Sequence, residues 1–238
     1  MQTLWPTDNL KKVLDKFNTQ IPEFSTLSNG LKLYHPWHLD GGGGDYRQYF
    51  LTAVKSHGKN YYKHAYEWCC GHSIIGFEIL TNGICDNLSL SDYYDLAVEI
   101  SLDNAQRLGY ADKVKGYVTP IISSIPHTEQ FDLVIGNPPN SMNGDGFISA
   151  GKLNGYKPEH ILHELRIGVD DNFETHKEFF ANIRNYITDD ADIFLTIHST
   201  MITMVKKDLS DPAGLEIKNV IDMMPRDPDL KIVHFKIQ

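Results

Sequence analysis

FDLVIGNPPN, residues 131–140, joins an apolar strand to a turn that must end it. The run Leu133–Ile135 lies between turn signals, which is typical of a strand buried on both faces of a parallel sheet. Pro138 and Pro139 lack a backbone N–H and have a fixed φ, so they stop the strand and stiffen the turn. Open α/β folds bind ligands at the carboxyl ends of such strands. The stretch therefore predicts a parallel sheet with a functional turn at residues 137–140.

Strands and helices alternate on both sides of this stretch. Only residues 224–230 separate the last two expected strands, too few for a crossover helix, so these strands must be antiparallel neighbours. The predicted fold class is α/β, with a seven-stranded Rossmann-like sheet, mostly parallel with an antiparallel C-terminal strand, and helices on both faces. We expect strands at 62–70, 84–91, 114–118, 131–136, 192–198, 217–223 and 231–237, and helices at 45–54, 74–81, 95–108 and 172–186.

The N-terminal part of the chain has a different character, and we predict an N-terminal extension over residues 1–58. Apolar residues at helical spacing predict a short helix over 9–17, and turn signals follow it up to the glycine run 41–44. That run has two readings, a lid over a bound ligand or a plain flexible loop. The main domain is then expected over residues 59–238, where the long Gly- and Asn-rich segment 141–158 reads as a functional loop.

Two residues upstream of the turn indicate a nucleoside site. Gly71 lies in the loop Glu67-Trp68-Cys69-Cys70-Gly71-His72-Ser73, which joins a strand to a helix whose N-terminus offers free N–H groups. Asp92 ends the next strand, 21 residues beyond Gly71, near the spacing expected of an acid that holds both ribose hydroxyls. The alternatives are a purely structural glycine and a cap for helix 95–108, supplied by Ser91 or Asp92.

These features together resemble the class I S-adenosylmethionine-dependent methyltransferases, particularly the branch of release-factor glutamine methyltransferases and nucleobase amino-group methyltransferases. The resemblance covers residues 62–140 and implies a methyltransferase sheet with S-adenosyl-L-methionine as the cofactor. It places an acid near the methionine moiety, a glycine in the loop and an acid on the ribose. Ser73 stands where the family usually has a second glycine, and the adenine contact falls on Thr119 or Pro120. The implied cofactor-binding residues are Glu67, Cys69, Gly71, Ser73, Asp92, Thr119 and Asn137.

The turn supplies the expected chemistry, and its catalytic residues are Asn137, Pro138, Pro139 and Asn140. The side-chain oxygen of Asn137 and the carbonyl of Pro138 can each accept one N–H of a planar NH2 group, which aims its lone pair at the methyl group. The same acceptors stabilise the positive charge that develops on the nitrogen. The alternative is an ordinary proline turn. Asn140 replaces the usual aromatic residue, so we expect Phe147 or Tyr156 to cover the target's face.

The composition indicates which partners and which compartment suit this chemistry. The net charge of -9, from 22 Lys and Arg against 31 Asp and Glu, gives no strong signal for duplex DNA. Three cysteines are too few for a disulfide framework, and no apolar run has the length of a membrane span, so we expect a cytoplasmic protein. No metal site is expected, because His160-Ile161-Leu162-His163-Glu164 lacks the order of a zinc motif.

The sequence therefore predicts an S-adenosylmethionine-dependent N-methyltransferase acting on a protein glutamine, an exposed nucleobase or a small planar molecule. Two other readings remain open. One is a catalytically silent S-adenosylmethionine-binding partner subunit, which Ser73 and Asn140 favour. The other is a nicotinamide-dependent oxidoreductase, which uses the same glycine and acid but leaves the proline turn unexplained.

Overall fold

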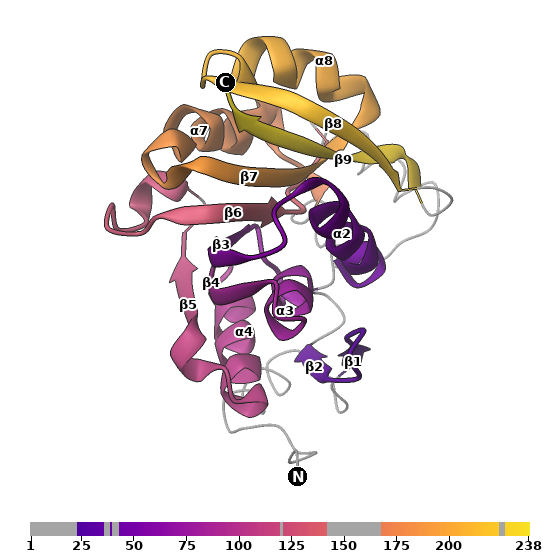
Figure 1. The fold of residues 1–238 in the computed structure, drawn as a ribbon, viewed down its shortest axis with the longest axis vertical. Helices are drawn as coiled ribbons and strands as arrows, with labels where there is room; N and C mark the ends of the chain where they lie inside the picture. Colours follow the sequence, from indigo (N-terminus) through magenta and orange to yellow (C-terminus); the bar gives the residue numbers. More distant parts are fainter. Residues whose placement is uncertain (1–22, 36–38, 40–42, 120, 142–167, 224–226) are drawn as a thin grey trace.

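The main sheet has seven strands in the order β5-β4-β3-β6-β7-β9-β8 (Figure 1). The computed structural model describes residues 23–35, 39, 43–119, 121–141, 168–223 and 227–238. All neighbouring strands are parallel except β9, which runs antiparallel to both β7 and β8. The predicted seven-stranded, mostly parallel sheet with a C-terminal hairpin is confirmed. The strands are β3 (Tyr62–Trp68), β4 (Cys85–Asp92), β5 (Val114–Val118), β6 (Phe131–Gly136), β7 (Ile187–His198), β8 (Leu215–Met223) and β9 (Asp227–Ile237).

Helices cover both faces of the sheet, as predicted, because each face of the central strands is apolar. The α-helices are α2 (Gly43–His57), α3 (Ile74–Thr81), α4 (Asp95–Leu108), α7 (Glu174–Asn182) and the short α8 (Ile202–Met204), which continues into a π-helix over Val205–Ser210. Short 3-10 helices lie at Ala111–Lys113, Ile122–Ser124, Asp171–Phe173, Ile183–Asn185 and Ser199–Met201.

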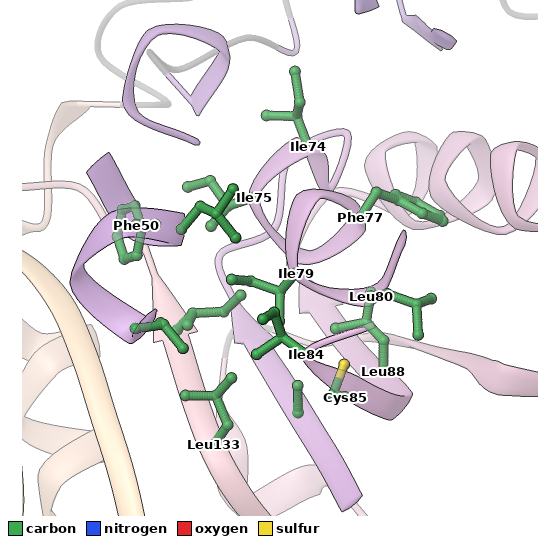
Figure 2. Packing of buried hydrophobic residues seen from close by; sticks show 14 of the residues in the cluster. Phe50, Ile74, Ile75, Phe77, Ile79, Leu80, Ile84, Cys85, Leu88 and Leu133 are labelled. Atoms are coloured by element: carbon green, nitrogen blue, oxygen red, sulfur yellow. The ribbon is translucent and has the colours of Figure 1, made fainter. Parts of the chain in front are cut away.

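Strand β6 divides the core into two layers, because its side chains alternate between the faces. Leu133 packs with Phe50 of α2 and Ile79 of α3 on one face, and Figure 2 shows these side chains gathered between the two helices and the sheet. Val134 points to the other face, where it joins the cluster that holds Phe179 of α7. Helix α3 is buried on nearly all sides, which explains why its sequence is apolar apart from Glu78 and Thr81.

Most differences from the predicted boundaries have a local cause. Strand β3 ends at Trp68 rather than at residue 70, because Cys69 adopts a positive φ of 54° that no strand can continue. The helix predicted over 172–186 is shorter, since Asn172 and Phe173 have φ of 53° and 58° and α7 begins only after them. Strand β7 begins earlier than predicted, and the helical turns over 199–210 were not predicted. The helix expected over 9–17 and residues 142–158 of the expected loop lie outside the described residues.

A small hairpin packs against the main body, and the sequence did not predict it. Its antiparallel strands are β1 (Glu23–Thr26) and β2 (Lys32–His35). The buried side chain of Asn104, from α4, holds β2 at both backbone groups of Tyr34, accepting from its N–H at 2.9 Å and donating to its carbonyl at 2.8 Å. Helix α2 packs against α3 and the sheet, and the division of the chain at residue 58 stays a prediction.

Replacing Asn104 with alanine should detach this hairpin. The change leaves the N–H and C=O of Tyr34 without their partner, and each unsatisfied buried group costs about 1–3 kcal/mol. We expect a lower free energy of unfolding in urea and faster proteolytic cleavage around residues 23–35. Gln106→Ala, at an exposed position of the same helix, is the control. An Asn104→Ala variant as stable and as protease-resistant as this control would contradict the assigned role.

Candidate functional site

Four chain segments meet at one edge of the sheet because the parallel strands before them end in register. Trp68 at the end of β3 lies beside Ser91 of β4 and Gly136 of β6, and Asp92 lies beside Val118 of β5. Along the carboxyl edge, the order of the segments that follow these strands is therefore Thr119, 92–94, 69–73 and 137–140. Most of the residues predicted from the sequence to form the site come from these segments, and ligands of open α/β folds bind at this edge.

The loop after β3 has an unusual backbone. Cys69, Gly71 and Ser73 have φ of 54°, 52° and 57°, and the residues between them do not have a positive φ. Such a conformation is uncommon outside glycine and costs about 1–3 kcal/mol per residue, so the surrounding structure must impose it. Three N–H groups of this loop are bonded within the chain: Cys70 donates to the Ser91 carbonyl at 2.9 Å, Gly71 to the Asp92 carboxylate at 2.9 Å and Ser73 to the Cys70 carbonyl at 2.7 Å. A Cβ on Gly71 would lie 2.9 Å from the carbonyl oxygen of Leu39, which excludes other residues there.

Asp92 joins this loop to the next one. Its carboxylate accepts the N–H of Gly71 at 2.9 Å and the N–H of Tyr94 at 3.0 Å. The alternative reading as a cap is not what the structure shows, because α4 begins after Tyr94 with no side-chain cap and Ser91 instead bonds Tyr66 at 2.6 Å. A carboxylate has about four acceptor sites. The glycine loop and the acid, which the sequence predicts to bind the same ligand, are thus in direct contact.

Glu67 lies beneath the loop with only 2% of its surface exposed. Ser73 donates its hydroxyl to this carboxylate, and the N–H groups of Ile75 and Gly76 at the start of α3 also bond it. Burial raises the pKa of Glu67 to about 8, although these hydrogen bonds act to lower it. A Cβ on Gly76 would meet this carboxylate and lie 2.9 Å from Leu88 Cδ2. Ser73 stands where the family usually has a second glycine. Its hydroxyl therefore stabilises the buried carboxylate of Glu67.

The turn after β6 is tied to the end of β7. The hydroxyl of Thr196 donates to Asn137 Oδ1 at 2.7 Å. The amide nitrogen of Asn140 donates to the Pro138 carbonyl at 2.8 Å and to Thr196 Oγ1 at 3.2 Å, and its oxygen accepts the N–H of His198 at 3.1 Å. Both acceptors expected to hold a target nitrogen thus already accept one bond from the chain. A carbonyl oxygen can accept two.

The end of β5 presents apolar surface next to Asp92. Thr119 is nearly buried. Its hydroxyl forms hydrogen bonds with the backbone of Ile121, so its side chain is bonded within its own segment of the chain. Pro120 lies outside the described residues. Tyr93, Val118 and Ile121 are instead 49%, 56% and 37% exposed, unusually high for large apolar side chains. Sequence reasoning missed these three residues, although each is an apolar residue close to the end of a strand.

A buried acid and histidine lie on the other side of Trp68. Asp170 accepts His176 Nδ1 at 2.6 Å and the N–H of Thr175 at 2.9 Å. Burial acts to raise the pKa of Asp170, but these bonds leave it below its usual value, while burial lowers the pKa of His176. The ring of His176 stacks on Phe173 with centroids 4.2 Å apart and meets Trp68 edge-on. No motif in the sequence indicated this pair, in which Asp170 binds Thr175 and His176 of α7.

Thr196 and His198 were also missed. Thr196 could have been noticed in the sequence as the one hydroxyl within the apolar run Ile193–Ile197. A buried hydroxyl needs a hydrogen-bond partner, so its presence there indicates a polar contact. Among the described residues no group of three or more His, Cys, Asp or Glu side chains is arranged to hold a metal ion. Within the same ranges, no helix is both long and apolar enough to cross a membrane.

No protein-family model matches the sequence. Solved structures do match. The ribosomal protein L11 methylase from Lactobacillus delbrueckii subsp. bulgaricus has a TM-score of 0.58 at 11% identity, over 83% of this chain and 80% of that one. A putative RNA methyltransferase from Pyrococcus horikoshii has a TM-score of 0.58 at 13% identity, over 98% of both chains. The M1A22 tRNA methyltransferase TrmK of B. subtilis has a TM-score of 0.53 at 8% identity, over 79% of this chain and 65% of that one.

The chain has the Rossmann-like methyltransferase fold. This confirms the predicted fold class, including the antiparallel strand near the C-terminal edge of the sheet. At these identities the likeness concerns the fold. The assignment of the site residues therefore stays a prediction that is argued from the geometry of this chain.

Glu67→Gln should change how stability depends on pH. A carboxyl group whose pKa is about 8 when folded and near 4.5 when unfolded binds more protons in the folded state between these values, so stability falls as pH rises through this window. The slope is at most about 1.4 kcal/mol per pH unit. We expect the glutamine variant to lack this fall in urea unfolding measured from pH 5 to 8. Glu99→Gln, at an exposed position of α4, should behave as wild type, and identical slopes for both variants would contradict the assignment.

Proposed function

We propose that this protein is an S-adenosylmethionine-dependent N-methyltransferase that acts on a planar amide or exocyclic amino nitrogen. The observation that carries the proposal is the placement of the Asn137-Pro138 turn on the sheet edge that also holds the Gly71–Asp92 contact. Residues 59–238 would form the catalytic domain, with 1–58 as an extension or lid. A cytoplasmic location is part of the same proposal.

The residues at the edge fit the cofactor. Asp92 lies at the end of β4 with acceptor sites suited to two ribose hydroxyls, and it is bonded to the glycine loop that would approach the ligand. The exposed side chains of Tyr93, Val118 and Ile121 provide apolar surface for a flat adenine ring. Glu67 would lie near the methionine end, and its bond to Ser73 fixes the floor of the loop. When bound, S-adenosylmethionine supplies a methyl group on a positively charged sulfur that a nitrogen can displace.

The chain's part in the reaction is to orient the nitrogen. Its lone pair is delocalised into a carbonyl or a ring, so it is a poor nucleophile. Acceptance of its N–H groups by Asn137 Oδ1 and the Pro138 carbonyl would aim the lone pair and stabilise the positive charge that develops. The fixed φ of Pro138 and Pro139 holds these acceptors in place without a backbone N–H to compete.

The fold does not identify the substrate, but the turn restricts it to molecules with a planar NH2 group. Proteins with similar structures are named for a ribosomal protein, RNA and tRNA. A protein glutamine, an exposed nucleobase or a small planar molecule each offers the planar NH2 group that the turn would accept. The net charge of -9 disfavours a long phosphate backbone and favours a protein or a small molecule.

Two other functions are less well supported. A silent cofactor-binding subunit is favoured by one observation, since the acceptors of the turn are already bonded within the chain. A nicotinamide-dependent oxidoreductase is disfavoured by the sheet, because β9 lies antiparallel between β7 and β8 and departs from the dinucleotide-binding strand order 3-2-1-4-5-6.

Calorimetric titration tests the cofactor. We expect binding of S-adenosylmethionine and S-adenosylhomocysteine, and none of NAD. Asp92→Ala should weaken the first two by about 10- to 100-fold, the effect of losing hydrogen bonds to a charged group. Asp92→Asn, which keeps an oxygen for Gly71 or Tyr94, should bind more tightly than the alanine variant but less tightly than wild type. Unchanged affinity in both variants would move the ribose contact elsewhere.

Methyl transfer tests the turn. Incubation with S-adenosylmethionine carrying a tritiated methyl group, together with protein, RNA and small-molecule fractions, should label one of them. Asn137→Ala should reduce this labelling by roughly 10²- to 10³-fold, comparable to the loss of one preorganised group at a charge-developing centre. Its affinity for S-adenosylhomocysteine should fall far less than its labelling rate. Retained labelling would reject the proposed chemistry, and binding without labelling by wild type would support the silent subunit.

A further inference from the structure

Thr196 is a buried hydroxyl in an otherwise apolar part of β7. It has no exposed surface, and its neighbours Leu195 and Ile197 pack into the core on one face of the sheet. A hydroxyl removed from water is costly unless it is hydrogen-bonded. Both partners of Thr196 come from the turn after β6, namely Asn137 and Asn140.

The direction of these bonds is fixed by chemistry. The amide nitrogen of Asn140 can only donate, so Thr196 Oγ1 accepts from it. The single hydroxyl hydrogen of Thr196 is then directed to Asn137, whose contacting atom is the acceptor Oδ1, at 2.7 Å. A chain of this kind, from Asn140 through Thr196 to Asn137, determines which end of the Asn137 amide faces β7. Without the hydroxyl, the Asn137 oxygen loses the bond that directs it toward Thr196.

Asn140 is itself anchored at both ends of its amide. Its nitrogen also donates to the Pro138 carbonyl at 2.8 Å, and its oxygen accepts the N–H of His198 at 3.1 Å. The Asn140 side chain thus orients the Pro138 carbonyl, which is the second acceptor in the turn, and also donates to Thr196. This accounts for an amide at position 140, because no aromatic ring could make these three bonds.

We propose that Thr196 is a positioning residue, which together with Asn140 orients the Asn137 amide so that its oxygen and the Pro138 carbonyl form one acceptor pair. The proposal rests on the proposed function and deepens it. A consequence for the substrate is that residue 140 belongs to the support of the acceptors and does not stack on the target. The competing view is that the same bonds only fasten the turn to β7.

A threonine-to-valine exchange separates these views, because valine has the same shape and lacks the hydroxyl. In protein labelled with ¹⁵N-asparagine, the side-chain signals of Asn137 and Asn140 are identified by their loss in the Asn137→Ala and Asn140→Ala variants. We expect Thr196→Val to shift the Asn137 signals, and Thr196→Ser to restore them. Thr188→Val is the matched control, since Thr188 lies on the same strand and its hydroxyl donates to Asp190 of β7 rather than to the turn after β6.

Turnover with tritiated S-adenosylmethionine is the second readout. Thr196→Val should reduce the labelling rate by roughly 10- to 100-fold, the scale of a misplaced reacting group, with S-adenosylhomocysteine affinity unchanged and with recovery in Thr196→Ser. Unchanged Asn137 signals in Thr196→Val would overturn the proposed relay. Shifted signals with full turnover would overturn its positioning role and leave a fastening contact. Cofactor binding without labelling by wild type would instead overturn the proposed function, and the spectra distinguish that failure from the first.

Discussion

The parallel pairing of β3 with both β4 and β6 is the constraint on which the site depends. Parallel neighbours end at the same edge, so the loops after these three strands meet although long stretches of chain separate them. Parallel strands also need cover on both faces, which α3 provides on one side and α7 on the other. The apolar core and the polar edge are therefore two results of one pairing pattern.

Much of this arrangement could be predicted from the sequence. The run Leu133–Ile135 identified the central strand, and the short link before β9 required a hairpin. The spacing of Gly71 and Asp92 indicated a shared ligand, and the two residues are in direct contact. These features were accessible because each depends on local pattern or on the general geometry of parallel sheets.

Other parts depend on contacts between distant segments and left no pattern to find. The partners of Asn140 on β7 lie more than 50 positions further along the chain, so they could not be assigned from neighbouring residues. The left-handed backbone of Cys69 and Ser73 was hidden for a different reason, because neither residue type favours it. In this conformation Ser73 donates its hydroxyl to the buried Glu67.

The contact between Tyr34 and Asn104 also bears on the order in which the chain can fold. The two residues are 70 positions apart, so β2 has no partner on α4 until that helix has been synthesised. The hairpin leaves the ribosome first yet reaches its final place only after β3, α3 and β4 are available. During synthesis, the earliest described segment can thus make this contact only after α4 has emerged, and a two-stranded hairpin alone is at best marginally stable until then.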